Sequence, residues 1–135
     1  MQVLFLKDHG EFHCGCRAVS SFIREEFGKL GQVHTIWPHP GKDPDLIVVN
    51  GEGSFNHNYG GQYLRVLDQY PGVKKVLVNS LWQDSDGLVP YLKQFDYLSV
   101  RETQSEAEMI RHGYYPEVYL DFSYYARCHV EPSEK

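Results

Sequence analysis

Short runs of β-branched and aliphatic residues, each bounded by turn-forming residues, recur along the chain. Each run is too short to form a stable helix, and apolar side chains at successive positions are typical of a strand that is buried on both faces. The pattern therefore predicts strands at residues 3–6, 33–36, 46–49, 76–78, 97–100 and 118–120.

Segments between several of these strands carry apolar residues at helical spacing. The clearest is 17–27, whose apolar residues fall on one face of a helix, and helices are also predicted at 62–70 and 105–112. The predicted order is β-α-β-β-α-β-α-β-α-β. Strands of this kind that alternate with amphipathic helices favour a Rossmann-like α/β fold, in which helices cover both faces of a mainly parallel sheet.

Length and charge limit the possible architectures and partners. The 135 residues fit one domain, which we expect at 1–128, followed by a polar tail at 129–135. A formal charge of −5 argues against nucleic acid as a partner, because a broad basic surface is lacking. The apolar runs are far shorter than the roughly 20 residues that span a bilayer, and the first residues lack the features of a signal peptide. We therefore expect no membrane span and a cytoplasmic location.

The three cysteines cannot all pair within one chain, so free thiols in a reducing compartment are the simpler interpretation. Cys14 and Cys16 lie close to His9 and His13, but no second pair follows at zinc-like spacing, and Cys128 stands alone. We therefore expect neither a metal site nor a cofactor. A catalytic thiolate at the start of the first helix is chemically possible, but no matching base is identifiable, which favours buried packing.

Candidate binding residues follow the predicted strands, because ligands of open parallel sheets bind beyond the carboxyl ends of the strands. The segment Asn50-Gly51-Glu52-Gly53-Ser54 follows one strand, and its glycines allow backbone N–H groups to approach an anion or a sugar. A plain tight turn explains the same residues equally well. The segment lacks the further glycines or the lysine of the nucleotide-binding loops, so those mechanisms are not supported.

Arg101 and Glu102 follow another predicted strand and precede a predicted helix N-terminus. A guanidinium group beside free N–H groups suits a carboxylate or a phosphate. A structural ion pair of Arg101 with Glu102 or with an aspartate is the alternative. Asn79 and Trp82 follow a third strand, where the indole ring is a candidate for stacking on a sugar, whereas packing is the favoured role of most other aromatic residues.

Taken in order, these segments resemble the N-terminal half of the polysaccharide pyruvyl transferase family. The resemblance is carried by residues 15–20, 45–57, 78–83 and 99–102, with Ser105 and Asp121. It implies a single half of a GT-B-like arrangement. It also implies transfer of a pyruvyl group from phosphoenolpyruvate to a sugar hydroxyl, with Arg101 as a donor ligand and with Gly15 and the glycine-rich segment lining the cleft.

The chain departs from the family in two respects. The family's C-terminal half, which carries a second arginine and a histidine, has no counterpart in these residues, and His13 occupies a position where the family usually has asparagine. The expected function is therefore a transferase of this type in a minimal form, or one completed by a second copy or a partner. The alternatives are a non-catalytic module that binds a sugar or phosphate ligand, and a nucleotide-sugar glycosyltransferase-like half.

Overall fold

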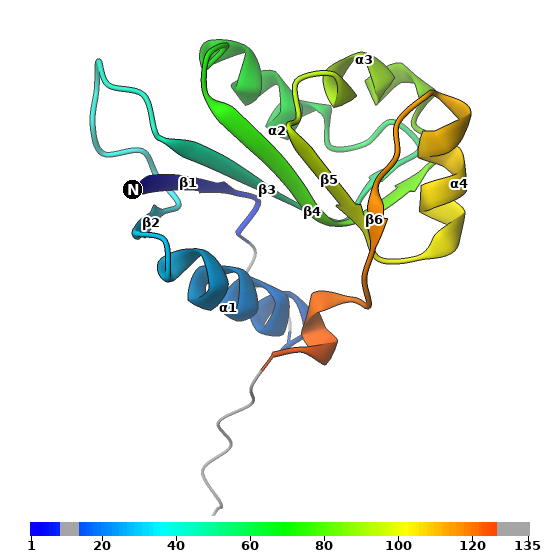
Figure 1. Ribbon diagram of the computed structural model, residues 1–135, viewed down its shortest axis with the longest axis horizontal. Coiled ribbons are helices and arrows are strands. Elements are labelled where there is room, and N and C mark those ends of the chain that lie inside the picture. The colour runs from blue at the N-terminus through cyan, green and yellow to red at the C-terminus, as the bar shows by residue number, and fades with distance from the viewer. Residues whose placement is uncertain (9–13, 127–135) are drawn as a thin grey trace, which may run out of the picture.

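The computed structural model describes residues 1–8 and 14–126, and these form a six-stranded sheet in which all strand pairs are parallel (Figure 1). The strand order is β2-β1-β3-β4-β5-β6. The strands are β1 Gln2–Leu6, β2 Gln32–His34, β3 Leu46–Asn56, β4 Lys74–Gln83, β5 Tyr97–Val100 and β6 Glu117–Val118. Every predicted strand is confirmed, and the predicted mainly parallel sheet is entirely parallel within the described residues.

The helices occupy the predicted places in the chain order. They are α1 Cys14–Gly28, α2 Gly61–Arg65, η1 Val66–Gln69, η2 Asp86–Leu88, α3 Val89–Leu92, α4 Thr103–Arg111 and η3 Phe122–Tyr124. The helix predicted at 62–70 is divided into an α-helical turn and the 3-10 turn η1. The predicted tail at 129–135 lies outside the described residues.

Two apolar cores lie on opposite faces of the sheet, as the amphipathic pattern predicts. On one face, Leu64, Leu92 and Met109 from α2, α3 and α4 pack against Ile47 and Val49 of β3, among other strand residues. On the other face, Val19 and Ile23 of α1 pack among residues that include Val3, Phe5 and Val48. Figure 1 shows α1 alone below the sheet and the other α-helices on the far side. The alternation of neighbouring strand residues between the two cores explains why the strands are continuously apolar.

Strands β3 and β4 extend well beyond the predicted boundaries, which corrects the expectation that Asn50 to Ser54 form a turn. Both extensions stay paired with each other: Glu52 pairs with Ser80 and Phe55 with Trp82. The polar residues that resemble a turn are therefore part of an irregular strand, with a register shift between Glu52 and Phe55. Burial of Phe55 and Trp82 further along explains why the pairing continues.

The order of the strands reverses between β1 and β3, because β1 leads to β2 on one side and β3 leads to β4 on the other. At such a switch point the connections leave towards opposite faces, and a crevice opens beyond the carboxyl ends of the two strands. Lys7 lies directly after β1, and Asn50 to Ser54 lie in the outer part of β3. The topology thus places these residues at the edge where a ligand site is expected.

Gly51 is the glycine at this edge that close packing requires. A Cβ atom at Gly51 would lie 2.4 Å from the Cβ and Oγ atoms of Ser80 and 2.5 Å from its Cα atom. We expect Gly51→Ala to lower the free energy of unfolding by roughly 1–3 kcal/mol, because the paired β4 backbone must move. Denaturant unfolding measures this, with Gly72→Ala as the control, since a Cβ at Gly72 meets nothing within 4 Å. Equal stability of the two variants would contradict the close approach.

Candidate functional site

Six of the described non-glycine residues have positive φ angles, and three of them lie at the level of the sheet where β1 and β5 end. These three are Lys7 (64°) after β1, Glu52 (37°) in β3 and Asn79 (54°) in β4. Backbone conformations of this kind are strained, and they cluster at ligand sites and active sites. Three adjacent strands therefore leave the regular sheet geometry at the same edge, which is also the edge at the switch point.

The ammonium group of Lys7 is buried beneath this edge, with 4% of the residue exposed. Its Nζ donates a hydrogen bond to the carbonyl oxygen of Gly51 at 3.0 Å, and it lies 5.2 Å and 5.4 Å from the ring centroids of Phe55 and Tyr63. Burial lowers the pKa of Lys7 to about 8; the Arg101 charge also lowers it, while Glu52 acts in the opposite direction. The ammonium group of Lys7 therefore loses its proton more readily than an ordinary lysine, and it interacts electrostatically with both Glu52 and Arg101.

Cys16 lies in the first turn of α1 and forms a hydrogen bond with Glu52. Burial raises the pKa of the Cys16 thiol, and the negative charge of Glu52 and this hydrogen bond raise it further. A helix N-terminus would act in the opposite direction, but here it is outweighed. The thiol is thus kept protonated, which agrees with the packing interpretation of this cysteine and not with a catalytic thiolate.

Arg101 forms an ion pair with Asp121: its Nη1 donates to Oδ2 at 2.7 Å. The two side chains are 27% and 34% exposed, so the pair is at the surface of the edge and not inside the core. The alternative of a structural ion pair with an aspartate is therefore what the structure contains. The other terminal nitrogen, Nη2, lies beside Gly53, where a Cβ atom would be 3.8 Å away. One arm of the guanidinium group thus faces the glycine-rich part of β3.

The carboxylate of Asp121 accepts hydrogen bonds from the backbone of Ser123 as well as from Arg101. Burial acts to raise its pKa, but hydrogen bonds from Ser123 and the Arg101 charge outweigh burial, so the pKa of Asp121 is below its ordinary value. The carboxylate is therefore ionised, and it orients Arg101 while neutralising part of its charge. An anionic ligand at Arg101 must share the guanidinium group with Asp121 or displace it.

Two buried asparagines connect the strand ends and keep unused hydrogen-bonding capacity. Asn50 donates through Nδ2 to the carbonyl oxygen of Lys7 at 3.4 Å, and the Oδ1 of Asn79 accepts from the backbone N–H of Phe122 at 2.9 Å. Asn50 Oδ1 and Asn79 Nδ2 have no partner among the described residues. Buried polar atoms without partners are rare, and they mark places where water or a ligand group completes the hydrogen bonding.

Two of the predicted ligand-binding side chains have structural roles. The carboxylate of Glu102 caps α4 by accepting hydrogen bonds from the backbone N–H groups of Gln104 and Ser105, at 3.2 Å and 2.8 Å. Trp82 is fully buried, and its ring packs 5.6 Å from the ring of Phe55. Because a buried indole offers no open face, the idea that Trp82 stacks on a sugar is wrong.

Of the remaining predicted residues, the structure brings Gly53 next to Arg101. Gly53 and Ser54 are at least partly exposed in the outer part of β3, and Gly53 lies next to Arg101. Gly15 lies beside Cys16 in the first turn of α1. His9 and His13 lie outside the described residues. Lys7 is not among the predicted site residues, and Asp121 is predicted only as part of the resemblance. The position of Lys7 directly after a strand is the signal that could have found it.

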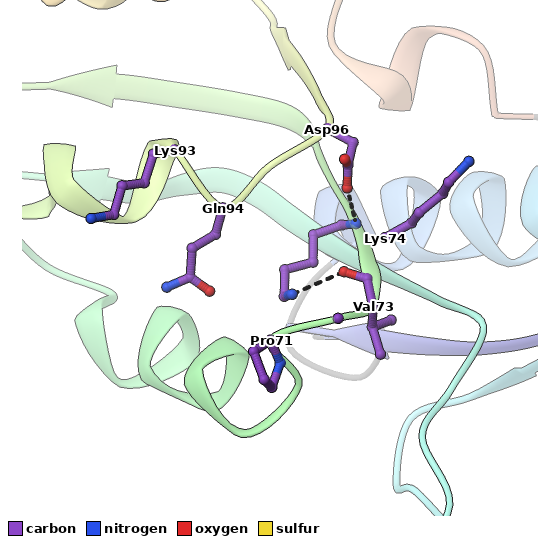
Figure 2. A pocket seen from close by; sticks show the side chains of 8 residues that line it. Pro71, Val73, Lys74, Lys93, Gln94 and Asp96 are labelled. Carbon is purple, nitrogen blue, oxygen red and sulfur yellow. Dashed lines mark hydrogen bonds between the residues drawn. The ribbon is translucent and has the colours of Figure 1, made fainter.

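A hollow lies at the edge of the sheet opposite the candidate site, near the start of β4 (Figure 2). It has a volume of about 430 Å³, and the lysines that line it include Lys74 and Lys93. Figure 2 shows these two side chains directed away from each other. The ammonium group of Lys75 is occupied by hydrogen bonds to the carbonyl oxygens of Tyr70 and Val73. The cations of this hollow therefore do not converge on a common ligand position.

Neither relatives of the sequence nor a metal-binding cluster identifies the function of the site. The sequence matches no protein-family model, and neither a curated protein nor a solved structure is significantly similar to it. Within residues 1–8 and 14–126, no group of three or more histidine, cysteine, aspartate or glutamate side chains could hold a metal ion. In the same part of the chain, no helix combines the length and the apolar character needed to cross a bilayer.

The electrostatic coupling at this edge can be measured through Lys7. We expect NMR titration of the lysine ε-methylene signals to give a pKa near 8 for Lys7. Arg101→Met should raise this pKa because it removes a neighbouring cation, and Glu52→Gln should lower it because it removes an anion. Glu25→Gln, on the exposed side of α1, is the control and should leave the Lys7 pKa unchanged. Insensitivity to both edge substitutions would show that the charges do not share a site.

Because the pKa of Lys7 is lowered in the folded protein, the free energy of unfolding should increase with pH in the alkaline range. Between about pH 8 and pH 10.5, Lys7 is protonated in the unfolded chain and neutral in the folded one, so the free energy of unfolding should rise with pH. The gain attributable to Lys7 is roughly 3 kcal/mol. Lys7→Met should abolish this part of the rise in denaturant unfolding measured across that range. An unchanged slope in the variant would contradict burial of the ammonium group.

Proposed function

We propose that the protein acts as a polysaccharide pyruvyl transferase-like protein, which transfers a pyruvyl group from phosphoenolpyruvate to a sugar hydroxyl. The observation that carries the proposal is the placement of two cations at the carboxyl edge of the sheet, with the Arg101 guanidinium group beside Gly53 and the Lys7 ammonium group bonded to the carbonyl oxygen of Gly51. Two cations at a strand switch point suit a donor with a phosphate and a carboxylate. The order of the resembling sequence segments supports the same substrate class.

In the proposed reaction, one sugar hydroxyl oxygen bonds to the central carbon of the donor, and the methylene carbon of the donor takes up a proton. A second hydroxyl oxygen of the same sugar then bonds to the central carbon as the bond from that carbon to the phosphate oxygen breaks. The products are the ketal and inorganic phosphate, which carries away the remaining hydroxyl proton. Arg101 would bind the donor through Nη2 while Asp121 holds Nη1 and fixes the plane of the guanidinium group. Glu52, whose charge acts on Lys7 and whose carboxylate is hydrogen-bonded to Cys16, would accept a hydrogen bond from a sugar hydroxyl.

The described residues of this edge do not include an evident acid for the methylene carbon. Cys16 is protonated but buried, and its hydrogen bond goes to Glu52. We therefore propose that the chain is one GT-B-like half and that a second copy or a separate partner supplies the remaining groups, because catalysis in such a cleft needs groups from both sides. Neither Cys14 nor Cys16 forms a disulfide among the described residues, which supports the cytoplasm as the proposed location.

A second candidate is a module that binds a small anionic or sugar ligand without turnover. The Arg101–Asp121 pair favours it, because half of the guanidinium group is already committed. Both candidates predict ligand binding at the same edge, and only the transferase predicts release of phosphate.

Incubation with phosphoenolpyruvate and a panel of glycans separates these functions. For the transferase we expect phosphate release that depends on both substrates and falls at least about 100-fold in Arg101→Ala. Phosphoenolpyruvate should also raise the melting temperature of the wild type but not of Arg101→Ala. Arg65→Ala, at an exposed position of α2, is the matched control for both readouts.

A thermal shift without phosphate release would contradict turnover by this chain or its own oligomer, and it would support the binding module. If the donor neither raises the melting temperature nor is consumed, both functions are contradicted. An equal loss in the Arg65 control would show that the effect of Arg101→Ala is not specific to the edge.

A further inference from the structure

An exposed aromatic surface lies at the β6 edge of the sheet and continues onto η3. We call it the edge strip, and it consists of the exposed residues Tyr115, Val118, Tyr119, Leu120, Tyr124 and Tyr125, together with the partly buried Phe122. Phe122 and Tyr125 also contact Phe22 of α1, with ring centroids 4.9 Å and 5.7 Å from that of Phe22. Figure 1 shows η3, in orange, against the end of α1 and below β6. Tyr119, Phe122 and Tyr125 of the edge strip thus lie together with Phe22 of the first helix.

An apolar hollow of about 440 Å³ adjoins the edge strip. It is lined by Phe22 and Phe27 of α1, by Val78 and Tyr97 of the sheet, and by strip residues that include Tyr119. A parallel sheet is normally covered by helices on both faces, and among the described residues only α1 and η3 contribute to this face. The hollow is thus a part of the sheet face that the described chain leaves open.

The exposed area of the edge strip is large enough for an interface. An aromatic side chain can bury roughly 150–250 Å², so the exposed parts of the four tyrosines, with Val118 and Leu120, amount to on the order of 600 Å² per copy. Contiguous apolar patches of this size mark interaction sites. Two copies that bury it would remove about 1,200 Å² from water, which is the lower bound for specific protein interfaces.

The charges and the shape of the edge strip favour a second copy of the same chain as the partner. Glu117 accepts hydrogen bonds from the hydroxyl groups of Tyr97 and Tyr119, and Asp121 is paired with Arg101, so no unpaired acid in this stretch would attract a basic partner. Tyr124 is 76% exposed, and its ring centroid lies 5.8 Å from that of Tyr125, which lines the apolar hollow. A two-fold interface needs a surface that is complementary to itself, and a projection beside a hollow of the same chemistry meets this requirement.

We propose that two copies of the protein associate through their edge strips with two-fold symmetry, and that Tyr124 of each copy enters the apolar hollow of the other. The inference does not depend on the proposed function. Because Asp121 immediately precedes η3, the second copy would lie next to the Arg101–Asp121 pair.

Sedimentation equilibrium of the 135-residue protein at about 0.15 M salt tests the proposal, since repulsion between two chains of charge −5 is then screened. We expect a species of twice the 15.6 kDa monomer mass at micromolar concentrations. Tyr124→Glu and, separately, Leu120→Glu should each weaken association at least about tenfold, because each places a charge in an apolar interface.

Tyr59→Glu is the matched control, because Tyr59 is 71% exposed and lies outside the edge strip. Circular dichroism melting of each variant establishes that it is folded, which we expect because Tyr124 and Leu120 are exposed in a single copy. A wild type that stays monomeric up to about 100 µM would overturn the proposal, because the dimer is expected at micromolar concentrations. So would a Tyr124→Glu variant that still dimerises, or a loss of dimer in Tyr59→Glu equal to that in the strip variants.

Discussion

The hydrogen bond from the ammonium group of Lys7 to the carbonyl oxygen of Gly51 connects the end of β1 to the middle of β3, and the geometry of the candidate site depends on it. It turns a cation inward at the strand switch point, where it stacks on Phe55 and Tyr63. It also fixes the backbone next to Glu52, whose positive φ angle begins the irregular part of β3. A buried cation is costly unless it is paired, and here carbonyl, ring and carboxylate groups supply the compensation.

This arrangement makes the edge a balanced set of charges. Lys7 and Arg101 are opposed by Glu52 and Asp121, so the free protein does not carry an uncompensated positive pocket. The binding free energy of an anionic ligand would therefore come more from replacing Asp121 at the guanidinium group of Arg101 than from long-range attraction. The unpartnered Oδ1 of Asn50 and Nδ2 of Asn79 offer additional hydrogen bonds at the same strand ends.

The sequence was sufficient for the sheet and for the edge where the site lies, because both follow from patterns of single residues. Apolar runs locate strands, and their two-sided burial predicts parallel pairing. The outer half of β3 could not be predicted, since Asn50 to Ser54 have turn composition and are kept in a strand by pairing with β4. Trp82 and Glu102 were placed at the correct edge, but their side-chain directions depend on tertiary contacts: the indole ring meets Phe55, and the carboxylate meets the N-terminus of α4.

A crystal structure of the protein with phosphoenolpyruvate tests the central claim most directly. Ligand density should lie at the carboxyl edge of the sheet, with an anionic group against Nη2 of Arg101 and the backbone of Gly53. Density confined to the hollow near Lys74, or an Arg101–Asp121 pair that excludes the ligand at saturating concentration, would contradict the account.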